Sequence, residues 1–319
     1  MRKKLSGYDV GALLYCPANA HTSIVDALVE QRFPTPFSLA FCLEDTVRAE
    51  AVPEAEALLE TTLGRVAAAA GDHAFFLPPV FVRVRSPEHL LRLAERYAPF
   101  SGILAGFILP KLFTENCAQY VAAIQSIGRT ASYFYMPVLE SASMLPLENR
   151  HAALAEVRDR LAEVSGSILN IRVGGNDLSH AFGLRRPVDR TIYDLGPVAA
   201  ILLDIVTAFG TQYVVSGPVW EYYAGPGWEE GLRRELELDL LNGFTGKTVI
   251  HPSQIPVVNE MLRVSSRDYA DARSILNWDR DSGSLVSASQ DGERMNEYNT
   301  HSNWARRIVS RAERYGTKP

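Results

Sequence analysis

The chain has 319 residues, of which 47% are hydrophobic and 22% are charged. This ordinary globular composition excludes a disordered tail, a collagen-like repeat and a disulfide scaffold. The 32 basic and 37 acidic residues give a net charge of −5, and no run of Lys or Arg stands out. We therefore expect no nucleic-acid partner, because binding to phosphates needs a basic face.

The cysteines and the apolar runs indicate the compartment. The sequence has three cysteines without CxxC spacing, which favours reduced thiols in the cytoplasm and argues against a zinc site. The longest apolar run, residues 103–109, is broken by Gly106 and followed by Pro110. Such a run is far too short to span a membrane. The sequence thus predicts a cytoplasmic protein without a membrane partner.

Short apolar runs recur along the chain and predict buried strands. Several are apolar nearly throughout, which is typical of parallel strands that are covered on both faces. In chain order the runs are Ala12–Cys16, Phe37–Leu43, Val80–Val84, Ile103–Leu109, Ser132–Leu139, Ile168–Val173, Tyr213–Ser216 and Thr248–Ile250.

The stretches between these runs carry apolar residues at three- and four-residue spacing, which predicts helices. The predicted helices are Ala49–Ala70, Pro87–Tyr97, Asn116–Ile127, Ala152–Val164, Ile192–Phe209 and Glu229–Leu241. Strands and helices alternating over about 250 residues have the size and order of an α/β fold, the (β/α)8 TIM barrel. A doubly wound open sheet is the alternative that strand counting leaves open.

The pattern changes near Leu262. We therefore expect a TIM-barrel domain over residues 1–262 and a C-terminal helical extension over residues 263–319. Within the extension, Tyr269–Trp278 is expected to be a helix and Gly283–Ser289 a short strand or hairpin. Asn303–Tyr315 is expected to be a basic amphipathic helix whose arginines face solvent.

Polar residues follow most of the predicted strands. In a TIM barrel the carboxyl ends of the strands surround the active site, so these residues are expected to share one level of the ring. They are Glu44 and Asp45 after the second strand, Arg83 and Arg85 at the third, Lys111 after the fourth, Glu140 after the fifth and Asp177 after the sixth.

Glu140 and Asp177 are carboxylates at the ends of consecutive strands. Two carboxylates, together with substrate oxygens and waters, form a common type of Mg²⁺ site to which the protein supplies few ligands. No Cys or His occurs in the segments 139–142 and 173–178 that end these two strands, which disfavours zinc. The expected cofactor is therefore Mg²⁺, bound by Glu140 and Asp177.

The motifs along this ring resemble those of the citrate lyase β-subunit-like (CitE-like) proteins of the HpcH/HpaI aldolase superfamily. The most specific one is GFTGKTVIHPSQI at 243–255, and the extension contains DGERMNE at 291–297. The remaining matches, in family order, are LLYCPAN (13–19), CLEDTV (42–47), FVRVR (81–85), ILPK (108–111), VLESA (138–142) and VGGNDL (173–178).

The resemblance implies a TIM barrel that binds Mg²⁺ through Glu140 and Asp177. It also implies a lyase that makes or breaks a C–C bond beside a carbonyl of a small carboxylate, often as a CoA thioester. Family members are commonly trimers or multiples of trimers, so a homotrimer or hexamer is expected. In such assemblies the extension closes over the site of a neighbouring protomer.

The expected chemistry passes through an enolate, which a bound metal stabilises as a Lewis acid. Arg83 is the candidate for stabilising the developing oxyanion, because a fixed guanidinium is a preorganised donor. Glu44 and Asp45 are expected to hold the arginine and metal waters in place, and Lys111 to bind substrate or pair with these acids. The resemblance implies that Glu297, in place of a family aspartate, transfers the proton.

The chain also departs from the family pattern, which makes it a divergent member. The first strand lacks the usual arginine, and Arg85 replaces an asparagine. We expect this additional cation to bind a second carboxylate or a phosphate of the substrate. Two alternatives stay open: a pyruvate-dependent class II aldolase without CoA, and an inactive barrel that serves as a binding or assembly subunit.

Overall fold

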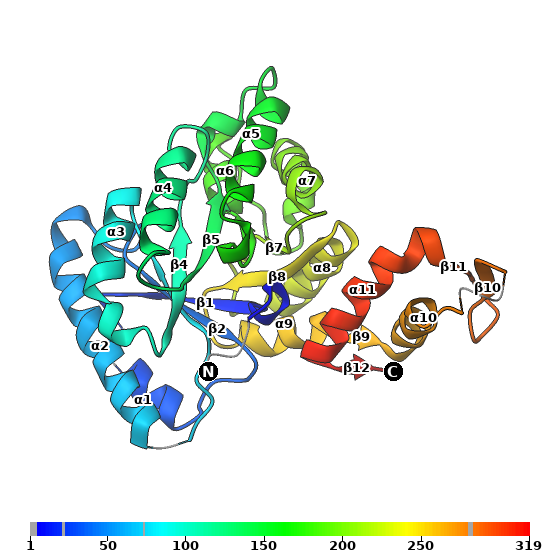
Figure 1. The fold of residues 1–319 in the computed structure, drawn as a ribbon, viewed down its shortest axis with the longest axis horizontal. Helices are drawn as coiled ribbons and strands as arrows, with labels where there is room; N and C mark the ends of the chain where they lie inside the picture. The colour runs from blue at the N-terminus through cyan, green and yellow to red at the C-terminus, as the bar shows by residue number, and fades with distance from the viewer. Residues whose placement is uncertain (1–4, 21–22, 73, 280–282) are drawn as a thin grey trace. The chain divides into compact units, whose positions relative to one another are not determined.

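The computed structural model describes residues 5–319 except 21–22, 73 and 280–282, and it divides into two compact units, Met1–Val258 and Asn259–Pro319. In the first unit, parallel strands β1 to β8 form a closed barrel in sequence order (Figure 1). This ring confirms the predicted TIM barrel and excludes the open sheet. The strands are β1 Ala12–Pro17, β2 Ser38–Cys42, β3 Val80–Arg83, β4 Leu104–Leu109, β5 Phe134–Leu139, β6 Ile171–Val173, β7 Val215–Gly217 and β8 Phe244–Val249.

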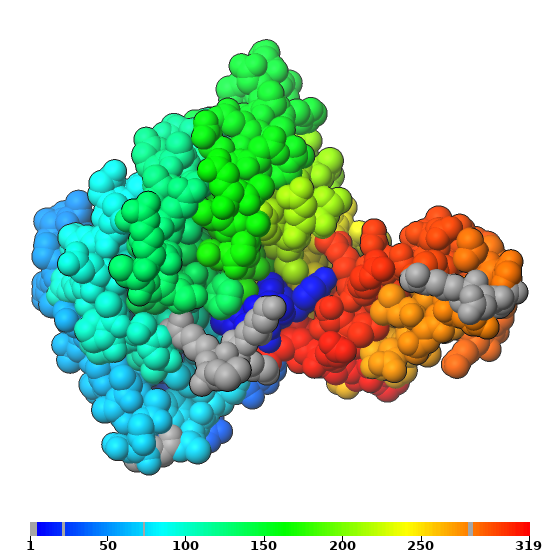
Figure 2. Space-filling model, in the orientation of Figure 1, coloured from blue at the N-terminus to red at the C-terminus, as the bar shows by residue number. Residues whose placement is uncertain are grey.

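Helices surround the barrel because the connections between parallel strands must cross back over the sheet. Neighbouring helices α3, α4 and α5 contact one another and form a layer around the strands (Figures 1 and 2). The helices are α1 Ile24–Val29, α2 Val52–Asp72, α3 Pro87–Arg96, α4 Cys117–Ile127, α5 Arg150–Ala162, α6 Gly175–Ala181, α7 Gly196–Phe209, α8 Trp228–Leu241 and α9 Gln254–Leu262.

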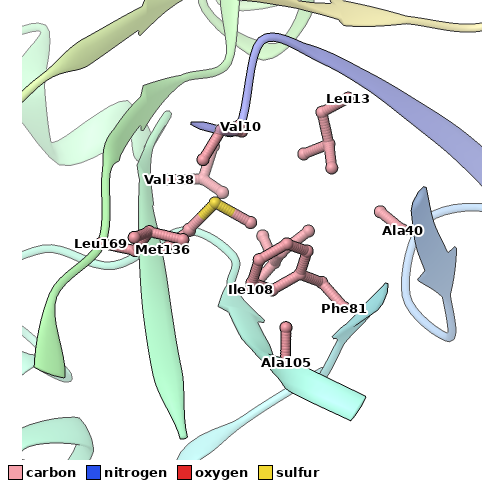
Figure 3. Packing of buried hydrophobic residues seen from close by; sticks show 9 residues of the cluster. All are labelled: Val10, Leu13, Ala40, Phe81, Ala105, Ile108, Met136, Val138 and Leu169. Carbon is pink, nitrogen blue, oxygen red and sulfur yellow. The ribbon is translucent and has the colours of Figure 1, made fainter. Parts of the chain in front are cut away.

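Apolar side chains fill the interior of the barrel. Leu13, Phe81, Ile108 and Met136 point toward one another from β1, β3, β4 and β5 (Figure 3). Val138 belongs both to this cluster and to the lining of a cavity above it. The apolar layer is therefore a packed core that forms the floor of the cavity, as in barrels of this size.

Strand β8 begins at Phe244, four residues before the predicted start at Thr248. The polar residues in its first half concealed it from a search for apolar runs. Lys247 is fully buried outside the ring, where its Nζ donates to Glu235 Oε1 and Asp239 Oδ2, both at 2.7 Å. The two carboxylates come from α8, so their charges allow a lysine to occupy a buried strand position.

The second unit has a helical core of its own. Helices α10 Ser266–Leu276 and α11 Tyr298–Tyr315 pack together through a small apolar cluster. An antiparallel hairpin of β10 Val286–Ala288 and β11 Met295–Glu297 precedes α11, and β9 Val264–Ser265 pairs with β12 Thr317–Lys318. Residues 280–282, between the predicted helix Tyr269–Trp278 and the predicted strand or hairpin Gly283–Ser289, lie outside the described residues.

Among the described residues, no helix combines the length and the apolar character that a membrane crossing requires.

Candidate active site

A cavity of about 460 Å³ opens at the carboxyl ends of the strands in the first unit. This is the end of a TIM barrel at which active sites are found. Its lining combines strand residues with residues of the loops that follow the strands. Those that carry polar or charged side chains are Tyr15, Asp45, Thr46, Arg83, Glu140, Arg172, Asn176, Asp177, Arg185, Glu221 and Thr248.

Glu140 and Asp177 line this cavity from the ends of adjacent strands, β5 and β6. Glu140 is 4% exposed, and its Oε1 accepts from Arg83 Nη2 at 2.8 Å and from the backbone N–H of Lys111 at 3.2 Å. Burial raises the pKa of Glu140 to about 7; the charge of Arg83 opposes this shift, whereas the charge of Asp177 adds to it. The two carboxylates are therefore close enough to repel each other.

The glycine at the end of β6 makes room for Glu140. A Cβ atom on Gly174 would lie 2.0 Å from Glu140 Oε2, and a Cβ atom on Gly175 would lie 2.5 Å from the side chain of Ile192. Any larger residue at either position would displace one of these groups. The Gly-Gly pair of the VGGND motif thus brings the start of α6, with Asp177 in its first turn, beside Glu140.

Arg83 joins three of the predicted acids. Its Nη2 lies 2.8 Å from Glu44 Oε2, 2.9 Å from Asp45 Oδ2 and 2.8 Å from Glu140 Oε1. Its Nε is buried and has no hydrogen-bond partner in the described part of the chain. The guanidinium is thus fixed through one nitrogen, 5.8 Å from the centre of the Tyr15 ring.

Lys111 binds the same acids instead of facing the cavity. Its Nζ donates to Glu44 Oε1 at 2.6 Å and to Asp45 Oδ1 at 2.8 Å. Its φ of 49° lies in the left-handed region, which residues with side chains rarely adopt and which is often found at functional sites. This conformation lets the Lys111 backbone bind Glu140 while its side chain binds the other two acids.

The pKa values of Glu44 and Asp45 shift in opposite directions. Burial raises the pKa of Glu44, against the charge of Arg83. Burial also acts to raise the pKa of Asp45, but hydrogen bonds with Glu44 and Lys111 and the charge of Arg83 lower it overall. At neutral pH Asp45 therefore carries a negative charge that holds both cations in place.

Arg85 does not line the cavity, where the sequence analysis expected it to bind a carboxylate or phosphate of the substrate. Its Nη1 donates to the backbone carbonyl groups of Leu43, Glu44 and Val47, at 3.0–3.1 Å. The residue lies at the turn after β3 and holds the loop that carries Glu44 and Asp45. Arg83 is the last residue of β3 and faces the cavity. Arg85 lies beyond the strand end, where the alternation of a strand no longer sets its direction, and its side chain is directed to the neighbouring loop.

Besides loop residues such as Arg185 and Glu221, the sequence analysis missed three cavity residues: Tyr15, Arg172 and Thr248. They lie within strands β1, β6 and β8, below the strand ends where polar residues were sought. Arg172 Nη2 donates to Thr248 Oγ1 at 2.6 Å. The signal that could have revealed it is an arginine in the middle of the apolar run Ile168–Val173.

Two residues of the most specific sequence motif, GFTGKTVIHPSQI, have structural roles. Lys247 binds α8, as described above. Gln254 is fully buried; its Nε2 donates to the carbonyl groups of Trp220 and Tyr222, and its Oε1 accepts from the Ile250 and His251 N–H groups. Gln254 thus ties the end of β8 to the segment after β7.

Glu297 lies in the second unit, at the end of β11 and directly before α11. Its backbone N–H donates to His301 Nδ1 at 2.9 Å. The preceding hairpin is fixed by Arg294, whose guanidinium binds Asp268 and Asp271 of α10. The acid–base role of Glu297 stays a prediction.

The residues present fit a Mg²⁺ ion. Glu140 and Asp177 supply hard oxygen donors in a cavity, and their mutual repulsion is relieved by a cation. Among the described residues, no group of three or more His, Cys, Asp or Glu side chains is placed to hold a metal. A site in this cavity would thus take the remaining ligands from substrate and water, as Mg²⁺ commonly does.

A family model described as C-C_Bond_Lyase of the TIM-Barrel fold matches residues 4–317, almost the whole chain. The chain belongs to this family. The C–C bond lyase family accounts for both the barrel and the C-terminal extension, because the match includes both. The resemblance noted in the motifs is therefore confirmed.

Curated relatives and solved structures agree with this family. A (3S)-malyl-CoA thioesterase of Cereibacter sphaeroides is 27% identical over 228 residues, which cover 72% of this chain and 70% of the relative. The CitE protein of Mycobacterium tuberculosis superposes with a TM-score of 0.62 at 21% identity, covering 96% of this chain and 99% of that chain. A citrate lyase of Burkholderia xenovorans gives 0.67 at 15% identity, covering 97% and 92%. At these identities the solved structures establish the shared fold.

Proposed function

We propose that this C–C bond lyase is Mg²⁺-dependent and cleaves a small 3-hydroxy or 2-oxo carboxylate, or its CoA thioester, in a retro-aldol or retro-Claisen reaction. The observation that carries the proposal is the position of Glu140 and Asp177 on one cavity, at the ends of adjacent strands, beside the fixed guanidinium of Arg83. Carboxylates suited to a divalent cation and a buried arginine suited to an oxyanion are the two requirements of this chemistry.

The ligands of the similar proteins support this substrate class. The Cereibacter relative is named for (3S)-malyl-CoA, and the CitE structure from Mycobacterium tuberculosis contains magnesium, acetoacetate and coenzyme A. A citrate lyase β subunit from Mycobacterium tuberculosis is complexed with oxaloacetate and magnesium. Small carboxylates recur among these ligands, and the cavity volume of about 460 Å³ is in the range of small-molecule sites.

Glu140 and Asp177 would hold the Mg²⁺, which supplies Lewis acidity at the substrate oxygens. When a 3-hydroxy substrate is cleaved, its hydroxyl loses a proton and becomes a carbonyl as the C–C bond breaks. The electron pair moves to the carbonyl oxygen of the departing fragment, and this enolate then takes up a proton at carbon. Arg83 lines the cavity and stabilises the negative charge on that oxygen, a contribution of about 3–4 kcal/mol per donor. Glu297 of the extension is the proposed acceptor of the proton.

Replacing Glu140 with Gln tests the proposal directly. We expect Glu140→Gln to abolish Mg²⁺ binding in calorimetry and to lower turnover by at least about a hundredfold, because an uncharged amide is a much weaker ligand. The control is Glu148→Gln, which removes an exposed acid from the following loop. Malyl-CoA and citramalyl-CoA are tested for cleavage, and pyruvate with an aldehyde for condensation. Undiminished Mg²⁺ binding by Glu140→Gln would overturn the proposal.

A further inference from the structure

Arg172 is a buried arginine on the cavity that has no acidic partner among the residues the structure describes. It lies within β6, is 1% exposed and belongs to the cavity lining. Its Nη2 donates to Thr248 Oγ1 at 2.6 Å, and its Nη1 is 3.5 Å from Asn170 Oδ1. Both acceptors are neutral, and no carboxylate in the described ranges forms an ion pair with this guanidinium.

The other buried arginines of the described chain are all paired with acids. Arg83 binds Glu140 at 2.8 Å, Arg150 binds Asp204 at 3.2 Å, and Arg186 binds Glu235 at 2.9 Å. Burying a charge without a counter-ion is costly. A fold retains such a group where a ligand supplies the missing charge, so the contrast marks Arg172 as a binding group.

The surroundings of Arg172 add hydrogen-bond donors for an anion. Burial raises the pKa of Tyr15, with the charges of Arg83 and Arg172 opposing, so its hydroxyl keeps its proton. Burial lowers the pKa of Arg172; Tyr15 opposes this and the charge of Arg83 adds to it. An anion between these groups would meet the guanidinium and the hydroxyls of Tyr15 and Thr248, and would relieve the repulsion between the two arginines.

The position of Arg172 in the barrel places this group beneath the proposed metal site. Its Cα pairs in register with Val138 of β5, which belongs to the apolar layer at the cavity floor. Glu140 and Asp177 instead follow the ends of β5 and β6. A ligand held at the strand ends therefore has its inner end directed toward Arg172.

We infer that Arg172, with the hydroxyls of Thr248 and Tyr15, forms an anion subsite that binds the second carboxylate of a small dicarboxylate substrate. This inference rests on the proposed function, because the first carboxylate and its neighbouring oxygen occupy the metal end of the cavity. The cation for a second carboxylate, which the sequence had suggested at Arg85, is thus Arg172. The substrate class becomes a 2-oxo or hydroxy dicarboxylate.

The test compares pyruvate, which has one carboxylate, with oxaloacetate and 2-oxoglutarate, which have two. Calorimetry with Mg²⁺ is expected to show that the intact protein binds at least one dicarboxylate about thirtyfold more tightly than pyruvate. In Arg172→Met this preference should fall below about threefold, while pyruvate binding changes less than threefold. Arg172→Lys keeps the charge and should retain part of the preference. A preference that survives in Arg172→Met would overturn the inference.

A second measurement separates this inference from the proposed function. In EDTA, succinate is expected to raise the melting temperature of the intact protein and to have no effect on Arg172→Met. Stabilisation by inorganic phosphate but not by succinate would overturn the assignment to a carboxylate. Pyruvate binding that does not depend on Mg²⁺ would count against the proposed function alone, because the succinate measurement contains no metal.

The stability of the variants distinguishes a binding group from a structural one. Without ligand, Arg172→Met should melt no lower than the intact protein, because it removes an unpaired buried charge. The matched control is Arg150→Met, which breaks a buried ion pair and should lower the melting temperature without changing ligand preference. A marked destabilisation by Arg172→Met together with an unchanged dicarboxylate preference would identify Arg172 as structural.

Discussion

Among the acids of the cavity, Glu140 is held in place by the largest number of separate elements. Arg83 of β3, the backbone of Lys111 after β4 and the small Gly174 after β6 all fix its carboxylate. Burial and the charge of Asp177 raise its pKa, so the folded chain tends to keep a proton there when no cation is bound. A divalent ion at Glu140 and Asp177 would replace that proton and restore the charge.

This raised pKa predicts a pH-dependent stability of the metal-free protein. The pKa of Glu140 rises from 4.5 to about 7 on folding, so its contribution is fully present below pH 4.5 and is lost as pH rises through 7. The loss is about 3 kcal/mol. Urea unfolding in EDTA should therefore show the intact chain losing stability relative to Glu140→Gln between pH 4.5 and 7.5. Parallel pH curves for the two proteins would contradict this prediction.

At the scale of the elements, strands of the barrel present side chains to two different environments. Arg83, Arg172 and Thr248 face the cavity, whereas Lys247 faces the helix layer and pairs with Glu235 and Asp239 of α8. The buried charges of α8 and β8 therefore fix how this helix lies on its strand. The register of β8 in turn places Thr248 beside Arg172.

Removing Lys247 should destabilise the barrel because it leaves buried acids behind. Burial already raises the pKa of Asp239, against the charge of Lys247. We expect Lys247→Met to lower the free energy of unfolding by about 3–5 kcal/mol. The double variant Lys247→Met with Asp239→Asn should recover part of this loss, because the uncompensated charge is gone. Urea unfolding measures both, and additive effects would contradict the pairing.

At the scale of the whole molecule, the residues proposed for the reaction are divided between the two compact units. The cavity lies in the first unit, and Glu297 belongs to the hairpin and helix of the second. Arg294 pairs with Asp268 and Asp271 of α10 and ties that hairpin to the helix within the second unit. The acid–base role proposed for Glu297 rests on the motif resemblance.

Glu297 is expected to act on the proton and not on the metal. Glu297→Gln should lower kcat by about 10²–10⁴-fold while the affinity for Mg²⁺ stays unchanged, because an amide cannot exchange a proton. Steady-state kinetics and calorimetry on the same preparation separate the two effects. Full activity of Glu297→Gln would show that the proton passes through another group.

The motif resemblance implies an assembly of several copies, which we propose to be a trimer or a hexamer. Light scattering on the full chain at micromolar concentration should give a mass that is a multiple of three times 35.3 kDa. A monomer at these concentrations would contradict the proposed assembly without affecting the metal site.

The sequence by itself determined that buried strands alternate with helices and which acids lie at the strand ends, whereas the closed ring in the structure excluded the open sheet. Buried parallel strands are nearly all apolar, so the polar residues that end them are conspicuous, and Glu140, Asp177, Glu44 and Asp45 were found in this way. The family motifs strengthened the same prediction.

Only the tertiary structure decided which way the basic residues point. Arg83 and Arg85 are two positions apart, yet one binds the acids at the strand ends and the other binds loop carbonyls. The charged strand residues Arg172 and Lys247 interrupted the apolar pattern. The partner of Arg172, Thr248, lies 76 positions away along the chain, and a partner of Lys247, Asp239, lies 8 positions away. Whether a buried charge is paired depends on contacts between distant segments, and these exist only once the barrel has closed.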